Sequence, residues 1–233
     1  MSSGEFAQGL CFYKLVLVFA VGALLGDLVE MLFCRWRMGR WMSRSSFIYG
    51  PFSAVWGFGF CIATFLFYQV EESNLLIMFA IGTATGGIYE YLCSVVTEYV
   101  LHAKFWDYSK MRFNLNGRIN LVYCMFWGIA VILWVKYVFP PIELMIGQIS
   151  PGTGKLLCDM ILLFFIGNAV ISALALMRYA QRKEGNAAVT PFMLWLDEHF
   201  DDDRIEKRYQ NMKICNQNLD GGCNPFLNHR LRF

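Results

Sequence analysis

Five long apolar stretches constrain the fold of this chain more than any other feature of its sequence. A helix that spans a bilayer needs ~20 predominantly apolar residues. The composition agrees, because 57% of the 233 residues are hydrophobic and only 16% are charged. The sequence therefore predicts an all-α, polytopic membrane protein with about five transmembrane helices, of which the second is interrupted by glycines and a proline. The predicted spans are 12–33, 49–67, 75–100, 119–139 and 156–179.

The residues after the fifth stretch differ in character. Thr190-Pro191 is typical of a helix start, and the segment that follows is amphipathic. We therefore divide the chain into a transmembrane domain, 1–185, and a cytoplasmic segment, 186–233, which contains an amphipathic helix and a flexible tail. Such a helix can lie on a membrane or pack on a partner. The acidic run 201–203 argues against anionic lipid and favours a protein partner or docking onto this chain itself.

Basic residues set the predicted orientation. They gather in the first connection, in the third connection and after the fifth span, whereas the second connection carries Glu71 and Glu72. Cytoplasmic loops of membrane proteins carry the excess of Lys and Arg. The N-terminus is thus expected outside and the C-terminus in the cytoplasm.

This topology brings the unusual polar residues to the inner half of the bilayer. Asp27 and Glu30 share one face of the first span, and Glu90 lies past the middle of the third. Ionisable groups at membrane depth cost a few kcal/mol each and usually pair. Arg118 is the expected partner of Glu30 or Glu90, with Arg44 as a second candidate.

The connection 105–121 concentrates further polar residues, including Asp107, Asn114, Asn116 and Arg118. Two interpretations stay open for the whole polar set. One is a structural ion pair that ties the helices together. The other is a cytoplasm-facing cavity that binds a small polar solute or a lipid headgroup, because helix N-termini and Arg118 favour phosphate or carboxylate. Glu98, near a span end, is expected in solvent.

Several chemistries lack a signature in the sequence. There is no catalytic motif, and PGTGK at 151–155 departs from a phosphate-binding Walker loop in its spacing and in the residue after Lys. Three histidines and eight cysteines are scattered without a Cys-x-x-Cys pair. We therefore expect no metal site, no cofactor, no disulfide framework and no nucleic-acid partner. Any ATP-driven transport requires a separate ATPase chain.

The polar motifs, taken in order, resemble the CmpB-like family of bacterial membrane proteins, the type IV ABC-transporter permeases. The resemblance covers roughly residues 15–140. It implies a transporter component of the bacterial cytoplasmic membrane. The motif residues are Gly26, Glu30, Gly50, Pro51, Glu90, Trp106, Asp107, Asn114, Asn116, Gly117, Arg118 and Trp127.

Two positions depart from the family pattern. Ala54-Val55-Trp56 stands where the family tends to have Pro-Ile-Tyr, and Asp27 replaces an apolar or aromatic residue. The second departure strengthens the acidic face of the first span.

The leading hypothesis is a transport component whose polar cavity binds a small polar solute or lipid headgroup. Five short spans make a small bundle, so assembly into an oligomer or with an ATPase is expected. One alternative is a membrane-embedded enzyme that acts on lipid, with Glu30 or Glu90 as general base and Arg118 on a phosphate. Another is a membrane scaffold that acts through its C-terminal helix.

Overall fold

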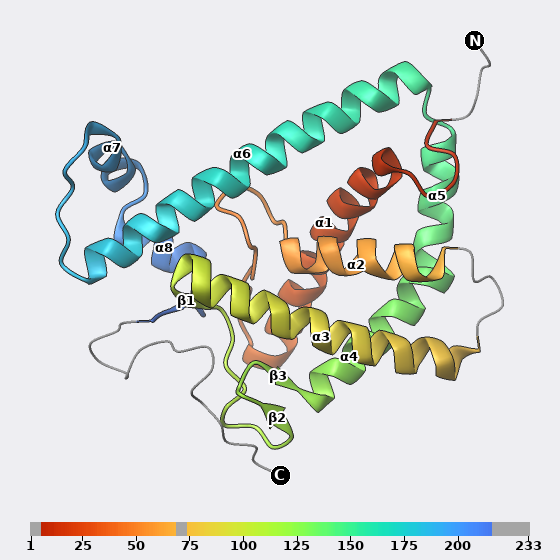
Figure 1. The fold of residues 1–233 in the computed structure, drawn as a ribbon, viewed down its shortest axis with the longest axis horizontal. Helices are drawn as coiled ribbons and strands as arrows, with labels where there is room; N and C mark the ends of the chain where they lie inside the picture. Colours follow the sequence, from red (N-terminus) through yellow and green to blue (C-terminus); the bar gives the residue numbers. More distant parts are fainter. Residues whose placement is uncertain (1–5, 69–73, 216–233) are drawn as a thin grey trace. The chain divides into compact units, whose positions relative to one another are not determined.

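The computed structural model describes residues 6–68 and 74–215 (Figure 1). It is predominantly helical, which confirms the all-α polytopic class. Two short antiparallel pairs, β1 with β4 and β2 with β3, accompany the helices. The elements in order are α1 (Phe12–Met38), α2 (Ala54–Phe67), α3 (Leu75–Leu101), β1 (Ala103–Lys104), β2 (Asn114–Leu115), β3 (Ile119–Asn120), α4 (Leu121–Leu133), the π-helical turn η1 (Trp134–Val138), α5 (Phe139–Gly147), α6 (Pro151–Lys183), α7 (Pro191–His199), α8 (Asp202–Arg208) and β4 (Lys213–Ile214).

Four helical segments in the described ranges are long and apolar enough to cross a membrane: Phe12–Met38, Leu75–Leu101, Leu121–Gly147 and Pro151–Lys183. The second predicted span, 49–67, becomes the 14-residue helix α2. At 1.5 Å per residue α2 is ~21 Å long, against a hydrocarbon core of ~30 Å. It begins only at Ala54 because Gly50, with φ of 76°, and Pro51 form a turn before it.

The fourth connection differs from its prediction. The predicted spans 119–139 and 156–179 leave Pro140 and Pro141 in a connection, but α4, η1 and α5 run on as one apolar segment to Gly147. A proline inside a helix removes one hydrogen bond and clashes with the carbonyl four residues earlier. The wider π-helical turn Trp134–Val138, directly before α5, accommodates both prolines at the start of the next helix.

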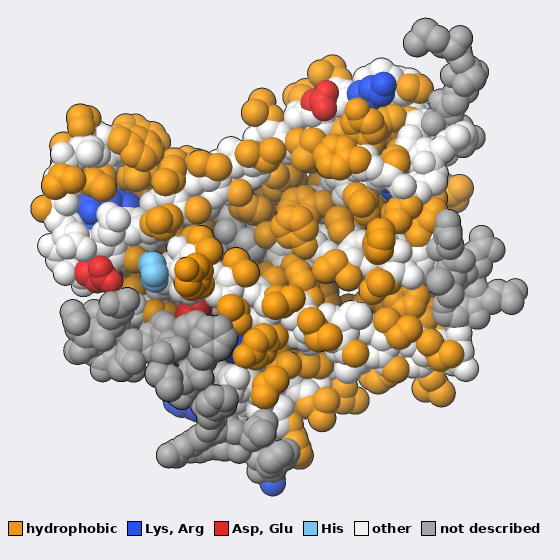
Figure 2. Space-filling model, viewed as in Figure 1, with side chains coloured by type: hydrophobic (Ala, Val, Ile, Leu, Met, Phe, Trp, Pro, Cys, Tyr) orange, Lys and Arg blue, Asp and Glu red, His pale blue; other side chains and the backbone are white. Residues whose placement is uncertain are grey.

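The surface of these helices is apolar. Figure 2 shows hydrophobic side chains over most of the visible face, with few charged groups among them. On α6, Leu163 and Ile166 are largely exposed. Contiguous exposed apolar surface of this extent marks contact with a membrane or a partner. Together with the span lengths, it identifies a membrane protein.

The chain forms two compact units, Met1–Gly86 with Val122–Gly167, and Gly87–Leu121 with Asn168–Phe233. The core of the first unit gathers residues from α1 to α5, including Val18, Met78 and Val131. Phe60 stacks on Trp134 with centroids 4.2 Å apart, and the Trp134 indole N–H donates to the Thr64 hydroxyl at 2.8 Å. This hydrogen bond satisfies the one polar atom of a buried tryptophan.

Close approach of α1 and α2 depends on Gly26. A Cβ at this position would lie 2.1 Å from the Cβ of Trp56. Small residues at helix interfaces let backbones approach closely in membrane proteins. The family motif glycine at the end of the first span therefore has a packing role.

In the second unit, the predicted amphipathic helix is divided into α7 and α8. The first helix ends at His199, and Asp201 starts the second, because its carboxylate caps α8 by accepting from the Arg204 N–H at 2.8 Å. Leu196, Phe200 and Ile205 are the buried apolar residues of this region. The predicted flexible tail, 216–233, lies outside the described residues, and the division at residue 185 stays a prediction.

Cysteine pairing partly differs from expectation. Cys215 is disulfide-bonded, which the scattered cysteine pattern did not predict. The free thiols in the described ranges are Cys11, Cys34, Cys61, Cys93, Cys124 and Cys158.

Replacing Gly26 with Ala tests the helix contact. The added methyl overlaps Trp56, so Gly26→Ala is expected to lower the free energy of unfolding by about 1–3 kcal/mol. Gly167→Ala is the matched control, since a Cβ there meets nothing within 4 Å. Thermal unfolding in detergent measures both, and equal stability of the two variants would contradict the assignment.

Candidate functional site: two polar clusters and a charged tail

The connection after α3 folds as a β-hairpin. Asn116 and Gly117 have φ of 55° and 69°, and the Arg118 N–H donates to the Leu115 carbonyl at 3.0 Å. Two positive φ values at the centre of this turn match type I′, for which Asn-Gly is the preferred sequence, and the pairing of Leu115 with Ile119 leaves residues 116–118 between the strands. Two observations require glycine at position 117. Its φ is positive, and a Cβ there would lie 3.0 Å from Asp107 Oδ1.

The other polar residues of this segment hold the hairpin in shape. Asn114 Oδ1 accepts from the Gly117 N–H at 2.8 Å, and its amide donates to the Met111 carbonyl at 2.6 Å. The Trp106 indole donates to the Arg118 carbonyl at 2.9 Å. Each of these bonds satisfies a backbone group of the turn.

Asp107 also stabilises the backbone of this connection. Its Oδ1 accepts from the Ser109 N–H at 2.9 Å. Burial alone would raise the pKa of Asp107, but the hydrogen bonds from Ser109 and the nearby Lys213 and Lys104 outweigh burial and lower the pKa. Asp107 is therefore a turn-forming carboxylate that stays ionised.

The hairpin places Arg118 in a buried ion pair with Glu98 of α3. Arg118 Nη1 lies 2.5 Å from Glu98 Oε2, and the two side chains are only 7% and 2% exposed. Nη1 also donates to Ser94 Oγ at 3.1 Å. The sequence prediction that Glu98 is solvated is wrong, and the partner of Arg118 is Glu98 rather than Glu90.

This ion pair is incompletely hydrogen-bonded. Within residues 6–68 and 74–215, Arg118 Nε has no hydrogen-bond partner, and Glu98 Oε2 makes the close contact without hydrogen-bond geometry. Lys104 Nζ lies 3.5 Å from the other oxygen of Glu98. A buried pair with imperfect geometry contributes little net stability, but losing one partner leaves a costly unpaired charge.

Glu90 and Asn116 bind tyrosines of the same unit. Glu90 is buried and accepts from the Tyr108 hydroxyl at 2.9 Å. The Asn116 amide donates to the Tyr91 hydroxyl at 3.1 Å. Five predicted site residues, Glu90, Asp107, Asn114, Asn116 and Arg118, therefore lie in this unit and make intramolecular bonds.

In the other unit, Asp27 fixes the loop between α1 and α2. Its carboxylate is fully buried and accepts from Ser43 Oγ at 2.8 Å and from the Arg44 N–H at 3.1 Å. Ser45 extends this loop by donating to the Phe52 carbonyl at 2.6 Å. The sequence analysis did not single out Ser43 and Ser45, whose clustering after a helix end was the available signal.

Glu30, one turn after Asp27, is more open. Glu30 Oε1 accepts from the Trp56 indole N–H at 2.7 Å. Its Oε2 lies 3.7 Å from Arg44 Nε, with side chains 23% and 33% exposed. Arg44, the second candidate of the sequence analysis, is thus the basic residue beside Glu30. We call Asp27, Glu30, Arg44 and Trp56 the Glu30 cluster.

An ion pair near the N-terminus of α1 was not predicted from the sequence. Lys14 is buried and pairs with Glu143 of α5, and the Tyr68 hydroxyl donates to Glu143 at 2.8 Å. A lysine near the start of an apolar run was the available signal. Glu143 lies between the predicted spans 119–139 and 156–179, so the sequence did not indicate it as the partner of Lys14.

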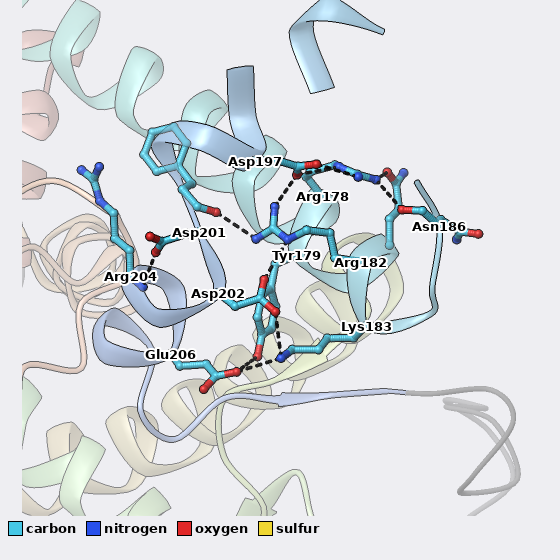
Figure 3. Close-up of polar contacts among 12 residues, drawn as sticks. Arg178, Tyr179, Arg182, Lys183, Asn186, Asp197, Asp201, Asp202, Arg204 and Glu206 are labelled. Atoms are coloured by element: carbon cyan, nitrogen blue, oxygen red, sulfur yellow. Dashed lines mark hydrogen bonds and ion pairs between the residues drawn. The ribbon is translucent and has the colours of Figure 1, made fainter. Parts of the chain in front are cut away.

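The contacts that hold the tail to α6 were also not predicted from the sequence (Figure 3). Arg178 makes a bidentate contact with Asp197 at 2.9 and 2.8 Å. Arg182 donates to Asp197 at 2.5 Å and to Asp202 at 2.7 Å, and Lys183 lies 2.9 Å from Asp202 and from Glu206. Docking of the C-terminal helices onto this chain was one of the predicted alternatives, and these contacts support it.

A comparison with known protein families identifies the relatives of this chain. The model of the family described as "Putative ABC-transporter type IV" matches residues 17–173. The chain belongs to this family. The match includes the Glu30 cluster, the hairpin and much of α6, so the resemblance extends further than the sequence motifs indicated. It ends before α7 and α8.

Comparisons with curated proteins and with solved structures find no match. The ABC-transporter-related family and the membrane-length helices together identify a membrane component related to transport. In the described residues no group of three His, Cys, Asp or Glu side chains is arranged to hold a metal ion.

A double-mutant cycle tests the Arg118–Glu98 pair. Arg118→Met leaves Glu98 charged and buried, so the free energy of unfolding is expected to fall by about 3 kcal/mol. Glu98→Leu is expected to act in the same direction. The double variant should lose less than the sum of the two, because no unpaired charge remains. Unfolding in detergent measures the cycle.

Lys110→Met is the control for charge removal, because Lys110 is exposed. Its effect should stay within about 0.5 kcal/mol. Strictly additive losses in the double variant would mean that Arg118 and Glu98 do not act as a pair.

Acid is expected to release the tail from α6. The hydrogen bond from Arg178 lowers the pKa of Asp197, and that from Lys183 lowers the pKa of Glu206. For Asp202, burial is outweighed by hydrogen bonds from Lys183 and Arg182, so its pKa is lowered as well. A carboxylate whose pKa is lowered in the folded state stabilises the docked tail at any pH above its ordinary pKa. That ordinary pKa is 3.8 for Asp197 and Asp202 and 4.5 for Glu206.

This stabilisation is lost as pH falls below those values and through the lowered pKa. Hydrogen exchange of the α7 and α8 amides should therefore accelerate in that acidic window. Asp197→Asn should shift the transition, whereas Asp203→Asn, at an exposed position, should not. Exchange that is independent of pH after correction for intrinsic rates would contradict the expectation.

Proposed function

We propose that this protein is the membrane-embedded subunit of a transport system that works with a separate ATPase chain. The observation that carries the proposal is the family match over residues 17–173, in a chain with membrane-length helices and no Walker loop. The proposed location is the bacterial cytoplasmic membrane, with the N-terminus outside and the C-terminus in the cytoplasm. Assembly as an oligomer or with the ATPase supplies the helices that a small bundle lacks.

We propose the Glu30 cluster as the place where the transported solute or a lipid headgroup binds. The Arg118–Glu98 pair is closed to solvent, whereas Glu30 and Arg44 are partly exposed and 3.7 Å apart. A separation of this length leaves guanidinium donors of Arg44 available to another acceptor. Phosphate or carboxylate would pair with Arg44, and a cationic group would pair with Glu30.

The other predicted residues take supporting roles in this proposal. Asp27 holds the loop that carries Arg44. Glu90, Asn114 and Arg118 stabilise the hairpin unit. This division favours a binding role for the first unit over the lipid-enzyme alternative, in which Arg118 would have to hold a phosphate.

Gentle purification from the native membrane, followed by native mass spectrometry, tests both parts. The wild-type protein is expected to retain an ATPase chain and a small molecule or lipid. Arg44→Gln should weaken retention of the small molecule by about tenfold, because charge-assisted hydrogen bonds contribute about 1.5–3 kcal/mol each.

Arg37→Gln is the matched control, because it removes the same charge from an exposed position of α1. It should leave ligand and ATPase in place. Retention of the ligand in Arg44→Gln would reject the Glu30 cluster as the binding site. Absence of any ATPase from all samples would reject the transport subunit, and turnover of detergent-solubilised lipid by the purified chain would favour the enzyme.

A further inference from the structure

The exposed side of α7 is largely apolar and aromatic, although it also carries Glu198. Phe192 and Trp195 are 50% and 40% exposed, and Val189, just before the helix, is 81% exposed. Phe192 stacks on Trp195 with centroids 6.0 Å apart, and Trp195 stacks on His199 at 4.6 Å. Figure 2 shows hydrophobic side chains gathered over the part of the surface where Figure 1 labels α7.

Two other side chains of α7 are used within the chain. Leu196 is buried, and Asp197 binds Arg178 and Arg182. Within the acidic run that argued against a membrane surface, Asp202 pairs with Arg182 and Lys183, and Asp201 caps α8. Ion pairing thus neutralises Asp197 and Asp202, two of the acids that would oppose contact with lipid, whereas Glu198 and Asp203 stay exposed.

The ion pairs also fix where α7 lies along a membrane span. Arg178 and Arg182 belong to the last turns of α6, a helix of 33 residues that is apolar enough to cross a bilayer. The apolar run of α6 ends at Met177, directly before Arg178. A helix bound to this level of a span lies at the boundary between hydrocarbon and headgroups, where Trp is enriched.

We propose that α7 is an interfacial helix, with Val189, Phe192 and Trp195 in the headgroup region of the bilayer. Helices of this kind lie in the interface with their apolar face ~5–10 Å into the headgroup and acyl boundary. The occupant of this face is zwitterionic lipid, because the three basic residues of α6 that are nearest to α7 are already paired with acids of the tail. Contact therefore does not depend on anionic lipid.

Quenching of tryptophan fluorescence by brominated lipid tests this placement. The full chain is reconstituted in phosphatidylcholine vesicles that carry bromine either near the headgroup or deep in the acyl chain. The emission difference between wild type and Trp195→Phe reports Trp195. We expect this difference signal to be quenched by shallow bromine more than by deep bromine, and equally with and without added anionic lipid.

A second tryptophan reporter checks the result independently of the indole at position 195. Val189→Trp in the Trp195→Phe background adds an indole at a highly exposed position outside the helix. It should show the same shallow quenching.

Two outcomes would overturn the proposal. Quenching of both reporters by aqueous iodide, with none by bromolipid, would place α7 in water. Protection from both quenchers would mean that another protein or a second copy of the chain covers this face.

Discussion

A charged side chain among apolar helices must bring its partner from the protein, because neither lipid nor a packed core hydrates it. The arrangement of this chain follows from that constraint. Lys14 meets Glu143, Arg118 meets Glu98, and Arg178 meets Asp197. Each pair joins segments that are distant in sequence or joins a helix to the segment after it, so the pairs act as connections as well as neutralising charge.

The pairs differ in how open they are, and this difference separates structural from candidate functional groups. Arg118 and Glu98 are enclosed, with hydrogen-bonding capacity of Arg118 left unused in the part of the chain that the structure describes. Glu30 and Arg44 are looser and reach the surface. An open pair exchanges its partner for a ligand at lower cost than a closed one, because less desolvation has to be repaid.

The tail illustrates how tertiary contacts change the meaning of a sequence pattern. Read along the chain, the acids from Asp197 to Asp203 form a negative segment unsuited to a membrane. In the fold, Asp197 and Asp202 turn toward the basic end of α6, and the aromatic residues of α7 become its outer face. The exposed surface of α7 is therefore more apolar than the local composition suggests.

The sequence by itself determined the class of protein, most helix positions and the importance of the polar motifs. Span length, hydropathy and turn residues such as Asn116-Gly117 are local properties, and local physics is sufficient to predict them. Which charges pair was decided only by the tertiary structure. Glu90 and Glu98 are two helical turns apart on α3, and sequence spacing does not distinguish which of them a hairpin arginine reaches. The same holds for the helix through Pro140 and for Lys14 with Glu143, because the backbone path and the packing of distant segments set these contacts.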